Sequence, residues 1–269
     1  MNLRLDGKNI LITGVSRMTG IGAGLAKALA EQGATVLVHG YAAYDAKQSY
    51  VDAKEDYVRE LVAELRGKGY TCHVLTPCDL SVPGSGARVI REALEYVPHL
   101  DGLVLNHAYS TFCPIGQWTE EDINMHLLTN VTAGMMMIQE FQRQKPAGVR
   151  GAITLFTSGQ YLGPMTTEIP YAVSKEAIIG LCKQAAAALA KDNIQVNCIN
   201  PGPVDTSYAF GETYEKIAKR FPSGRWGMPS DVAKLVHFLQ SDYSAWITGE
   251  VIASEGGFRR DHDDHADED

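Results

Sequence analysis

The sequence predicts one α/β domain, in which a doubly wound parallel sheet of about seven strands has helices on both faces. Short runs rich in β-branched residues alternate with longer helical stretches along the chain. Most of these runs are almost continuously apolar, as in parallel strands whose two faces are both covered. No linker, composition shift or repeat divides the 269 residues, of which 45% are hydrophobic. We therefore expect one domain over residues 1–258, followed by a short tail.

Each element follows from this alternation. The expected strands are 9–13, 35–39, 72–76, 102–106, 151–157, 194–199 and 249–253. The expected helices are 21–32, 52–67, 85–96, 119–143, 169–190 and 229–240. The fourth of these helices carries apolar residues at helical spacing, namely Ile123, Leu127, Val131, Met135 and Ile138. Such an order favours right-handed βαβ crossovers.

Two longer segments interrupt the alternation. Residues 40–52 exceed the usual length of a βα loop, and residues 201–228 hold a short helical piece over 213–220. Both follow the carboxyl end of a strand, where α/β proteins place ligand lids.

Composition narrows the function classes. No run approaches the roughly 20 apolar residues of a membrane helix, and residues 1–7 lead directly into a strand, so neither a membrane span nor a secretory signal is expected. The 5 cysteines are scattered without a C-x-x-C pair, which favours a reducing cytoplasm over disulfides or zinc. The net charge of -8 gives no basic stripe for nucleic acid.

The charge is concentrated at the end of the chain. Residues 261–269 contain six acids and no Lys or Arg, so the rest of the chain carries -2. We expect residues 259–269 to form an acidic, disordered tail. His262 and His265 show metal-ligand spacing within it, but no metal site is predicted.

The first expected strand runs into the glycine turn, residues 13–22 (TGVSRMTGIG). Glycines at this point allow the backbone to approach a pyrophosphate, and the following helix offers free N–H groups and a positive dipole end. Strand, turn and helix follow one another in the required order. The turn therefore predicts a phosphate-binding site.

A second constellation consists of Ser158, Tyr171 and Lys175. Tyr171 and Lys175 are four residues apart in an expected helix, so their side chains share one face. An ammonium beside a phenol favours the phenolate and lowers the phenol pKa. Ser158, at the end of the fifth strand, can donate a hydrogen bond to a carbonyl oxygen next to Tyr171.

Together these residues resemble the classical short-chain dehydrogenase/reductase family over residues 5–258. The resemblance rests on the glycine turn, Asp79-Leu80, Asn106-His107-Ala108, Asn130, Ser158, Tyr171-Ala-Val-Ser-Lys175 and Asn200-Pro-Gly-Pro-Val-Asp-Thr206. It implies a Rossmann-like sheet, a nicotinamide dinucleotide, and hydride exchange between the nicotinamide C4 and a carbonyl or alcohol carbon.

The resemblance also implies residue roles. Tyr171 would be the general acid for reduction, Ser158 would polarise the carbonyl, and Lys175 would lower the tyrosine pKa. Asn130 would support a water in the proton relay. The implied cofactor contacts are Gly14, Ser16, Arg17, Gly20, Ile21 and Gly22 on the phosphate side, Asp79, Leu80, Asn106, His107 and Ala108 on the adenosine side, and Tyr171, Lys175, Pro201, Gly202, Val204 and Thr206 on the nicotinamide side.

Three features depart from the family pattern. Five residues, 15–19, separate Thr13-Gly14 from the next glycine, where the family usually has three. His107 stands where the family has a second asparagine, and is either a ligand contact or a packed loop residue. The longer turn, Ser158-Gly-Gln-Tyr161 and the ending Ser254-Glu-Gly-Gly-Phe258 resemble the 3-oxoacyl-[acyl-carrier-protein] reductase-like subgroup.

The second strand indicates the cofactor. It ends in His39-Gly40-Tyr41, with no acid before Asp45 to bind the ribose hydroxyls of NAD. Arg17 in the turn suits bidentate pairing with a phosphate. We therefore expect NADP(H), with NAD(H) as the alternative if Asp45 folds back onto a ribose.

The favoured function is reduction of a 3-oxoacyl-type ketone. The alternatives are an alcohol or sugar dehydrogenase of secondary metabolism and a non-catalytic dinucleotide-sensing regulator. The partner expected is a small carbonyl or alcohol substrate, an acyl thioester among them, with no nucleic acid and no membrane.

Three further features bear on partners. An acidic carrier protein needs a basic patch at the mouth of the site, for which the candidates are Arg143, Lys145, Arg150 and Lys191. Aromatic residues in 201–228 suit either an apolar substrate or packing within the lid, namely Tyr208, Phe210, Tyr214, Phe221 and Trp226. Resemblance to the family, with close helix approach permitted at 185–188, suggests a homotetramer.

Overall fold

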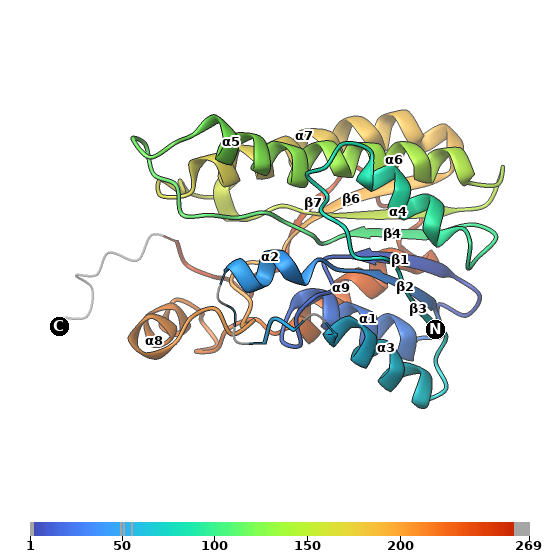
Figure 1. Cartoon of the computed structure of the whole chain (residues 1–269), viewed down its shortest axis with the longest axis horizontal. Helices are drawn as coiled ribbons and strands as arrows, with labels where there is room; N and C mark the ends of the chain where they lie inside the picture. Colours follow the sequence, from blue (N-terminus) through green and yellow to red (C-terminus); the bar gives the residue numbers. More distant parts are fainter. Residues whose placement is uncertain (1–2, 49, 51, 55, 261–269) are drawn as a thin grey trace.

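The computed structural model describes residues 3–48, 50, 52–54 and 56–260. It contains a seven-stranded parallel sheet in the order β3-β2-β1-β4-β5-β6-β7 (Figure 1). The strands are β1 (Asn9–Thr13), β2 (Thr35–His39), β3 (Cys72–Val74), β4 (Gly102–Leu105), β5 (Gly151–Phe156), β6 (Ile194–Asn200) and β7 (Val251–Ala253). The predicted fold class, a single doubly wound α/β domain, is confirmed.

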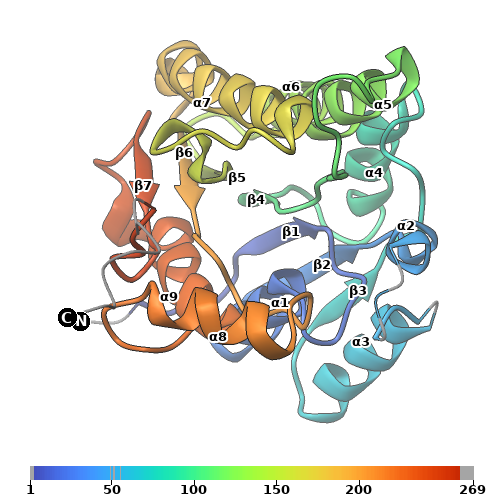
Figure 2. The ribbon, with the colours of Figure 1, turned by 90° about the vertical axis from the view of Figure 1, so that its left-hand side faces the viewer.

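Helices cover both faces of this sheet. One layer holds α4 (Ser85–Ala93), α5 (Glu120–Leu127), α6 (Ala133–Gln144) and α7 (Ile169–Leu189). The other layer holds α1 (Ile21–Glu31), α3 (Tyr57–Gly67), α8 (Gly211–Lys219) and α9 (Pro229–Gln240). Figure 2 shows the two layers on opposite sides of the strands, with α2 (Ala42–Lys47) beside one edge. Short 3-10 turns are η2 (Gly159–Tyr161), η3 (Ala190–Asp192) and η4 (Asp242–Ser244).

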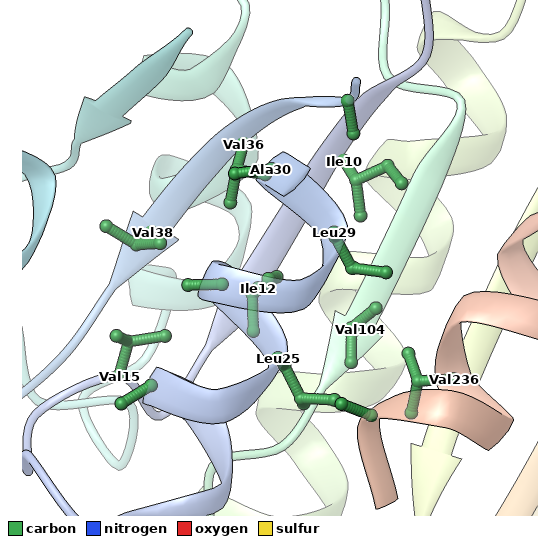
Figure 3. Close-up of a cluster of buried hydrophobic side chains, with 14 of the residues drawn as sticks. Ile10, Ile12, Val15, Leu25, Leu29, Ala30, Val36, Val38, Val104 and Val236 are labelled. Carbon is green, nitrogen blue, oxygen red and sulfur yellow. The ribbon is translucent and has the colours of Figure 1, made fainter. Parts of the chain in front are cut away.

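Alternation along the strands builds the two cores. Ile10 and Ile12 of β1 point toward α1 and α9, and pack there with Leu25, Leu29 and Val236 (Figure 3). Leu11, between them, belongs to the opposite core, which α4, α6 and α7 cover. Burying one such aliphatic side chain contributes about 1.5–3 kcal/mol. Both faces of each central strand are therefore buried, which explains why its residues are almost all apolar.

Strand order fixes where a ligand can bind. The chain passes from β3, at one edge of the sheet, back to β4 beside β1. Helices after β1 and β4 thus leave on opposite faces and open a crevice at the carboxyl ends of these two strands. The glycine turn and residues 106–108 both follow these ends.

Two local expectations were wrong. Residues 40–52 hold α2, which the sequence analysis treated as a loop. The single helix expected over 119–143 is interrupted by a π-helical segment, η1 (Leu128–Thr132). The π segment changes the helical phase, so Leu127 and Met135 are 36% and 51% exposed instead of facing the core.

Most of the expected tail falls outside this description, but Arg259 and Arg260 are described and are held by Arg220 and Glu255. Residues 261–269, including His262 and His265, are not among the described residues. Within the described part, no helix combines the length and apolar character that crossing a bilayer requires.

Candidate active site

Two adjoining cavities lie at the carboxyl edge of the sheet. The first, of about 590 Å³, is lined by the glycine turn, α2 and the segments after β3 and β4. The second, of about 840 Å³, is lined by Ser158, Tyr171 and the segments after β5 and β6. Both cavities share five lining residues, namely Ile21, Gln48, Tyr50, Ser110 and Thr206. They therefore form one cleft with two halves.

The glycine turn leaves space that side chains would fill. Gly14 has φ +73, and a Cβ there would lie 2.8 Å from the backbone of His107. A Cβ on Gly22 would lie 2.3 Å from the carbonyl oxygen of Gly14. Helix α1 begins at Ile21, and no side chain caps its first turn. The turn thus presents free backbone N–H groups at a close approach, which fits a dinucleotide diphosphate.

Arg17 crosses the cleft instead of pointing into solvent. Its Nε donates to Asp52 Oδ1 at 2.8 Å, and its guanidinium lies 3.6 Å from the centroid of the Tyr50 ring. Its Nη2 donates to the carbonyl oxygen of Thr206. Asp52 also accepts bonds from Thr19 N at 3.0 Å and Thr19 Oγ1 at 2.7 Å. The turn, which is two residues longer than the family pattern, is therefore bound through Arg17 and Thr19 to the segment after α2. Asp52 compensates the charge of Arg17.

Asp45, the alternative ribose acid, does reach the first cavity. It lies on α2, is 8% exposed, and accepts a hydrogen bond from Ser16 Oγ. Burial raises the pKa of the Asp45 carboxyl, while the Ser16 hydrogen bond opposes that rise. The first cavity thus contains both Arg17 and an acid.

Hydrogen bonds hold the residues that were predicted to contact adenosine. Asn106 Nδ2 donates to the carbonyl oxygens of Thr13 at 3.2 Å and Gly14 at 3.0 Å, which ties β4 to the turn. Asp79 Oδ1 accepts from Ser81 N at 2.8 Å. His107 lies between Thr13 Oγ1 at 2.6 Å and the carbonyl oxygen of Thr129 at 3.0 Å.

His107 is neutral as a consequence. Burial lowers its pKa to about 3. Because a carbonyl oxygen only accepts, Nε2 carries the proton and Nδ1 accepts from the threonine hydroxyl. His107 is therefore a packed loop residue whose edge also lines the first cavity.

Ser158 and Tyr171 meet in the second cavity. Ser158 follows β5 in extended backbone, and Tyr171 lies in the first turn of α7. Burial raises the pKa of Tyr171 to about 12, and a hydrogen bond with Ser158 opposes this rise. The phenol is therefore a protonated acid, contrary to the lowered pKa that the sequence pattern predicts. Burial, which penalises the phenolate, is the largest cause of this rise, and the charge of Glu168 adds to it.

Lys175 lies behind Tyr171, on the same helix. Its ammonium group is 5.5 Å from the centroid of the tyrosine ring and donates to the carbonyl oxygen of Phe156 at 3.0 Å. The residue is 3% exposed, and burial lowers its pKa to about 8. It lines neither cavity in this conformation. The lysine is thus a buried cation next to the phenol.

Asn130 lies in the π-helical segment and is 4% exposed. Its Oδ1 accepts from Tyr109 N at 2.6 Å, and its Nδ2 donates to Tyr109 O at 2.9 Å and to Ser174 Oγ at 2.8 Å. These bonds join the loop after β4 to α7 next to Lys175. The amide group of Asn130 thus bonds to Tyr109 and Ser174 and does not face the cleft.

The remaining predicted residues divide between the two halves. The first cavity is lined by Gly14, Ser16, Arg17, Gly20, Ile21, Asp79, Leu80, Asn106, His107, Ala108 and Thr206. The second is lined by Ile21, Ser158, Tyr171, Pro201, Gly202, Val204 and Thr206. Gly22, Asn130 and Lys175 line neither cavity.

The aromatic residues of the lid mostly pack on one another. Trp226 is 2% exposed and stacks on Tyr214, with ring centroids 5.1 Å apart. Phe221 also contacts Trp226, whereas Phe210 is 66% exposed. Of this set, only Tyr208 lines the second cavity.

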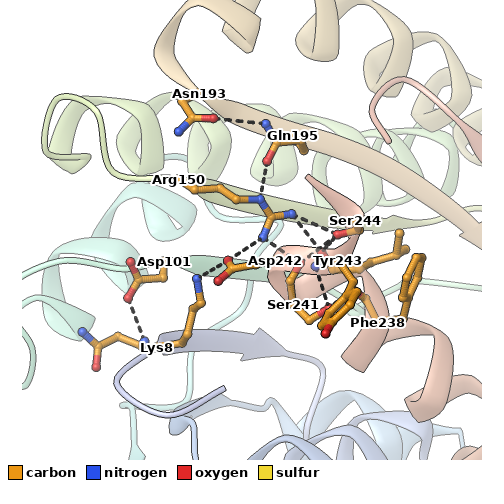
Figure 4. Close-up of polar contacts among 12 residues, drawn as sticks. Lys8, Asp101, Arg150, Asn193, Gln195, Phe238, Ser241, Asp242, Tyr243 and Ser244 are labelled. Carbon is orange, nitrogen blue, oxygen red and sulfur yellow. Dashed lines mark hydrogen bonds and ion pairs between the residues drawn. The ribbon is translucent and has the colours of Figure 1, made fainter. Parts of the chain in front are cut away.

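The candidate basic patch is at the opposite edge of the sheet. Arg143 ends α6, Lys145 and Arg150 precede β5, and Lys191 precedes β6. Figure 4 shows Arg150 within a polar network that includes Gln195, Ser244 and Asp242. All four candidate bases therefore lie toward the amino ends of strands, and they form no basic patch at the mouth of the site.

The sequence analysis missed several lining residues. The unpredicted α2 region contributes Tyr44, Gln48 and Tyr50. The segment before α7 contributes Met165 and Glu168. Only the unusual length of residues 40–52 signalled the first group. Among the described residues, no three His, Cys, Asp or Glu side chains are arranged to hold a metal.

Comparisons with known proteins agree with this geometry. The family model described as Enoyl-(Acyl carrier protein) reductase matches residues 14–259. The uncharacterised oxidoreductase YjdA of Bacillus subtilis is 31% identical over 255 residues, covering 94% of this chain and 97% of the relative. A solved dehydrogenase/reductase from Sinorhizobium meliloti 1021 is 29% identical, with TM-score 0.81, covering 95% of this chain and 96% of that one.

A third similar protein is a 3-oxoacyl (acyl-carrier-protein) reductase from Agrobacterium tumefaciens C58, solved with NADP bound. It is 28% identical, with TM-score 0.83, and the match covers 96% of each chain. The matches extend over nearly the whole length of all these proteins. The chain therefore belongs to the short-chain dehydrogenase/reductase family and is an oxidoreductase.

Proposed function

We propose that this protein is a nicotinamide-dependent reductase that converts a ketone into a secondary alcohol, with Tyr171 as the proton donor. The observation that carries the proposal is that Ser158 and Tyr171 line the second cavity, with the Lys175 ammonium 5.5 Å from the centroid of the tyrosine ring, next to a glycine turn that fits a diphosphate. A dinucleotide-sensing regulator has no need of a phenol held between a serine and a buried lysine.

The proposed mechanism divides the work among three side chains. A bound nicotinamide dinucleotide supplies the hydride. The Ser158 hydroxyl donates to the substrate carbonyl oxygen, which polarises the carbonyl carbon. Tyr171, protonated because its pKa is about 12, donates its proton to the oxygen as negative charge develops there. Lys175 stabilises the phenolate left behind, and Asn130 positions α7 through Ser174.

For the cofactor, we propose NADP(H), with NAD(H) as the second candidate. Lys47, exposed at the first cavity, suits a 2′-phosphate, and Arg17 lines the same cavity but is paired with Asp52. Asp45, in the same cavity, favours NAD(H) because a carboxylate accepts from ribose hydroxyls and repels a phosphate. Steady-state kinetics with both cofactors test this proposal, and a strong preference for NADH contradicts it.

For the substrate, we propose two candidates. A 3-oxoacyl-type ketone is supported by the similarity to a 3-oxoacyl reductase and by the exposed Phe112 at the second cavity. An alcohol or sugar substrate is supported by Glu168, which places an acid in that cavity. Turnover of acetoacetyl thioesters, sugars and cyclic ketones under NADPH and NADH is the test, and the absence of any hydride transfer overturns the proposed function.

We propose a homotetramer in the cytoplasm as the working state. Exposed apolar residues on the outer side of the α5, α6 and α7 layer support self-association, namely Leu127, Met135 and Val173. The cytoplasmic proposal rests on the 5 free cysteines. Sedimentation at micromolar concentration tests the oligomeric state.

A further inference from the structure

One acid in the second cavity neither gives nor takes a proton in the proposed mechanism, although its charge raises the pKa of Tyr171. Glu168 immediately precedes α7, three residues before Tyr171, and lines the cavity together with Tyr171 and Ser158. Its backbone is fixed on both sides. Residue 168 forms a parallel β-bridge with Cys113, and its carbonyl oxygen accepts a hydrogen bond from Ala172 N at 2.9 Å. The backbone that carries this carboxylate is therefore fixed close to Tyr171 in the same cavity.

This carboxylate has no partner within the described part of the chain. Glu168 is the residue before the first turn of α7, yet its side chain does not cap the helix. Neither an ion pair nor a side-chain hydrogen bond to it is found there. The side chain is half-buried, and burial alone raises its pKa. A desolvated acceptor without a donor costs free energy, which a ligand donor recovers.

The other charges of the second cavity are already engaged. Arg260 forms two hydrogen bonds to Glu255, at 2.7 and 2.6 Å. Arg220 donates to the carbonyl oxygens of Arg259 and Arg260 and lies 4.8 Å from the centroid of the Phe258 ring. Neither arginine contributes to the pKa shift of Glu168. Glu168 is thus the acid of this cavity that no described residue pairs or hydrogen-bonds, whereas Arg220 is held by neutral carbonyl oxygens and a ring.

We propose that Glu168 binds a hydrogen-bond donor of the substrate, so that the enzyme acts on ketones or alcohols that carry a hydroxyl or ammonium group. The inference rests on the proposed function and decides between its two substrate candidates. A 3-oxoacyl thioester has neither donor next to its keto group, and an acidic carrier gains nothing from a carboxylate at this point. The position next to Glu168 therefore selects against anionic and purely apolar groups on the ketone.

A matched series of 4-substituted cyclohexanones tests this selection. The substituents are methyl, hydroxyl, dimethylammonium and carboxylate, and the proteins are the wild type, Glu168→Gln and the control Glu64→Gln, which alters an exposed acid on α3. In the wild type, kcat/KM is expected to be at least about tenfold higher for the ammonium ketone than for the carboxylate ketone. Glu168→Gln reduces this ratio to within about threefold, and because the ratio compares two ketones within one protein, any effect of the lost charge on Tyr171 cancels.

A binding measurement separates this inference from the proposed function. In Tyr171→Phe with saturating NADPH or NADH, the same four ketones are titrated by calorimetry, with and without Glu168→Gln. The inference is supported if the order of affinity among the four ketones changes when Glu168 is replaced by Gln. If this result is found and the wild type turns over no ketone, only the proposed function is wrong. Equal effects of Glu168→Gln on all four ketones, or tighter binding of the carboxylate by the parent, overturn the inference whether or not turnover occurs.

Discussion

The two ends of the sheet both carry buried polar groups, but they satisfy them differently. At the amino ends, Asp101 accepts from Asn9 N at 2.9 Å and pairs with Lys145 at 3.0 Å. Arg150 there finds acceptors on Gln195 and Ser244. At the carboxyl ends, Glu168 lacks a partner among the described residues, and burial shifts the pKa values of Tyr171 and Lys175 away from their ordinary values.

This difference separates structure from function. A buried charge that is fully paired contributes to holding β1, β4 and β5 together. A buried charge that is not paired costs stability, and it persists where a ligand or a reaction uses it. We therefore expect substitutions at the amino edge to alter stability alone, and substitutions at the carboxyl edge to alter activity alone. The predictions below test that separation.

The largest effect is expected at Lys175. Lys175→Met should lower kcat/KM about 10³-fold, because the cation that stabilises the tyrosine phenolate is removed. The melting temperature should stay equal or rise, because methionine fills the same space without the cost of burying a charge. Kinetics and calorimetric melting check both parts. A fall in stability that matches the fall in activity would assign Lys175 a structural role.

The second effect is expected at the amino edge. Asp101→Asn keeps the side-chain shape but leaves the ammonium of Lys145, itself 2% exposed, without a counter-charge. Stability should fall by about 3 kcal/mol, while kcat stays within about twofold of the wild type. Urea unfolding and kinetics at 25 °C measure the two quantities. Asp56→Asn, at an exposed pair with Arg59, is the control and should change stability by less than about 0.5 kcal/mol.

The third effect concerns the glycine turn. Gly22→Ala adds a Cβ that would lie 2.3 Å from the carbonyl oxygen of Gly14, so the turn must shift. The dissociation constant of the cofactor should rise at least about tenfold, because the diphosphate cradle changes shape. Gly67→Ala, where a Cβ meets nothing within 4 Å, is the control. Unchanged cofactor affinity in Gly22→Ala would remove the phosphate role of the turn.

The smallest effect is a pH dependence. The pKa of Lys175 is lowered to about 8, so its ammonium is lost as pH rises through that value. Reduction should therefore slow in alkali, and kcat/KM at pH 8.5 should be about fourfold below that at pH 7. Lys175→Arg should shift this alkaline limb upward, because a guanidinium stays charged. A profile that is flat to pH 10 in the wild type would contradict the assignment.

The sequence predicts the fold well because the two cores depend on local alternation. Ile10 and Leu11 point to opposite faces as their spacing requires, and six expected helices have counterparts in the structure. Helix α2 was not predicted, because its six residues lie in a segment without an apolar face of helical period. The π segment was not predicted either, because the apolar spacing over 119–143 fits one continuous α-helix and does not signal the wider turn at Leu128–Thr132.

The site was predicted less completely, for a related reason. Motif spacing identifies Ser158, Tyr171 and Lys175 but does not reveal their burial, and burial sets the direction of both pKa shifts. The partners of Arg17 and the isolation of Glu168 depend on segments far apart in the chain. The four candidate bases (Arg143, Lys145, Arg150 and Lys191) lie at the edge of the sheet opposite the site because they fall near the starts of strands. Their number in the sequence does not show this position.

The central claim is that Tyr171 gives up the proton as hydride arrives. Single-turnover reduction of a ketone substrate by wild-type and Tyr171→Phe protein, each with saturating cofactor, tests it most directly. We expect Tyr171→Phe to bind the cofactor with unchanged affinity and to transfer hydride at least about 10³-fold more slowly. Hydride transfer at the wild-type rate in Tyr171→Phe would contradict the account.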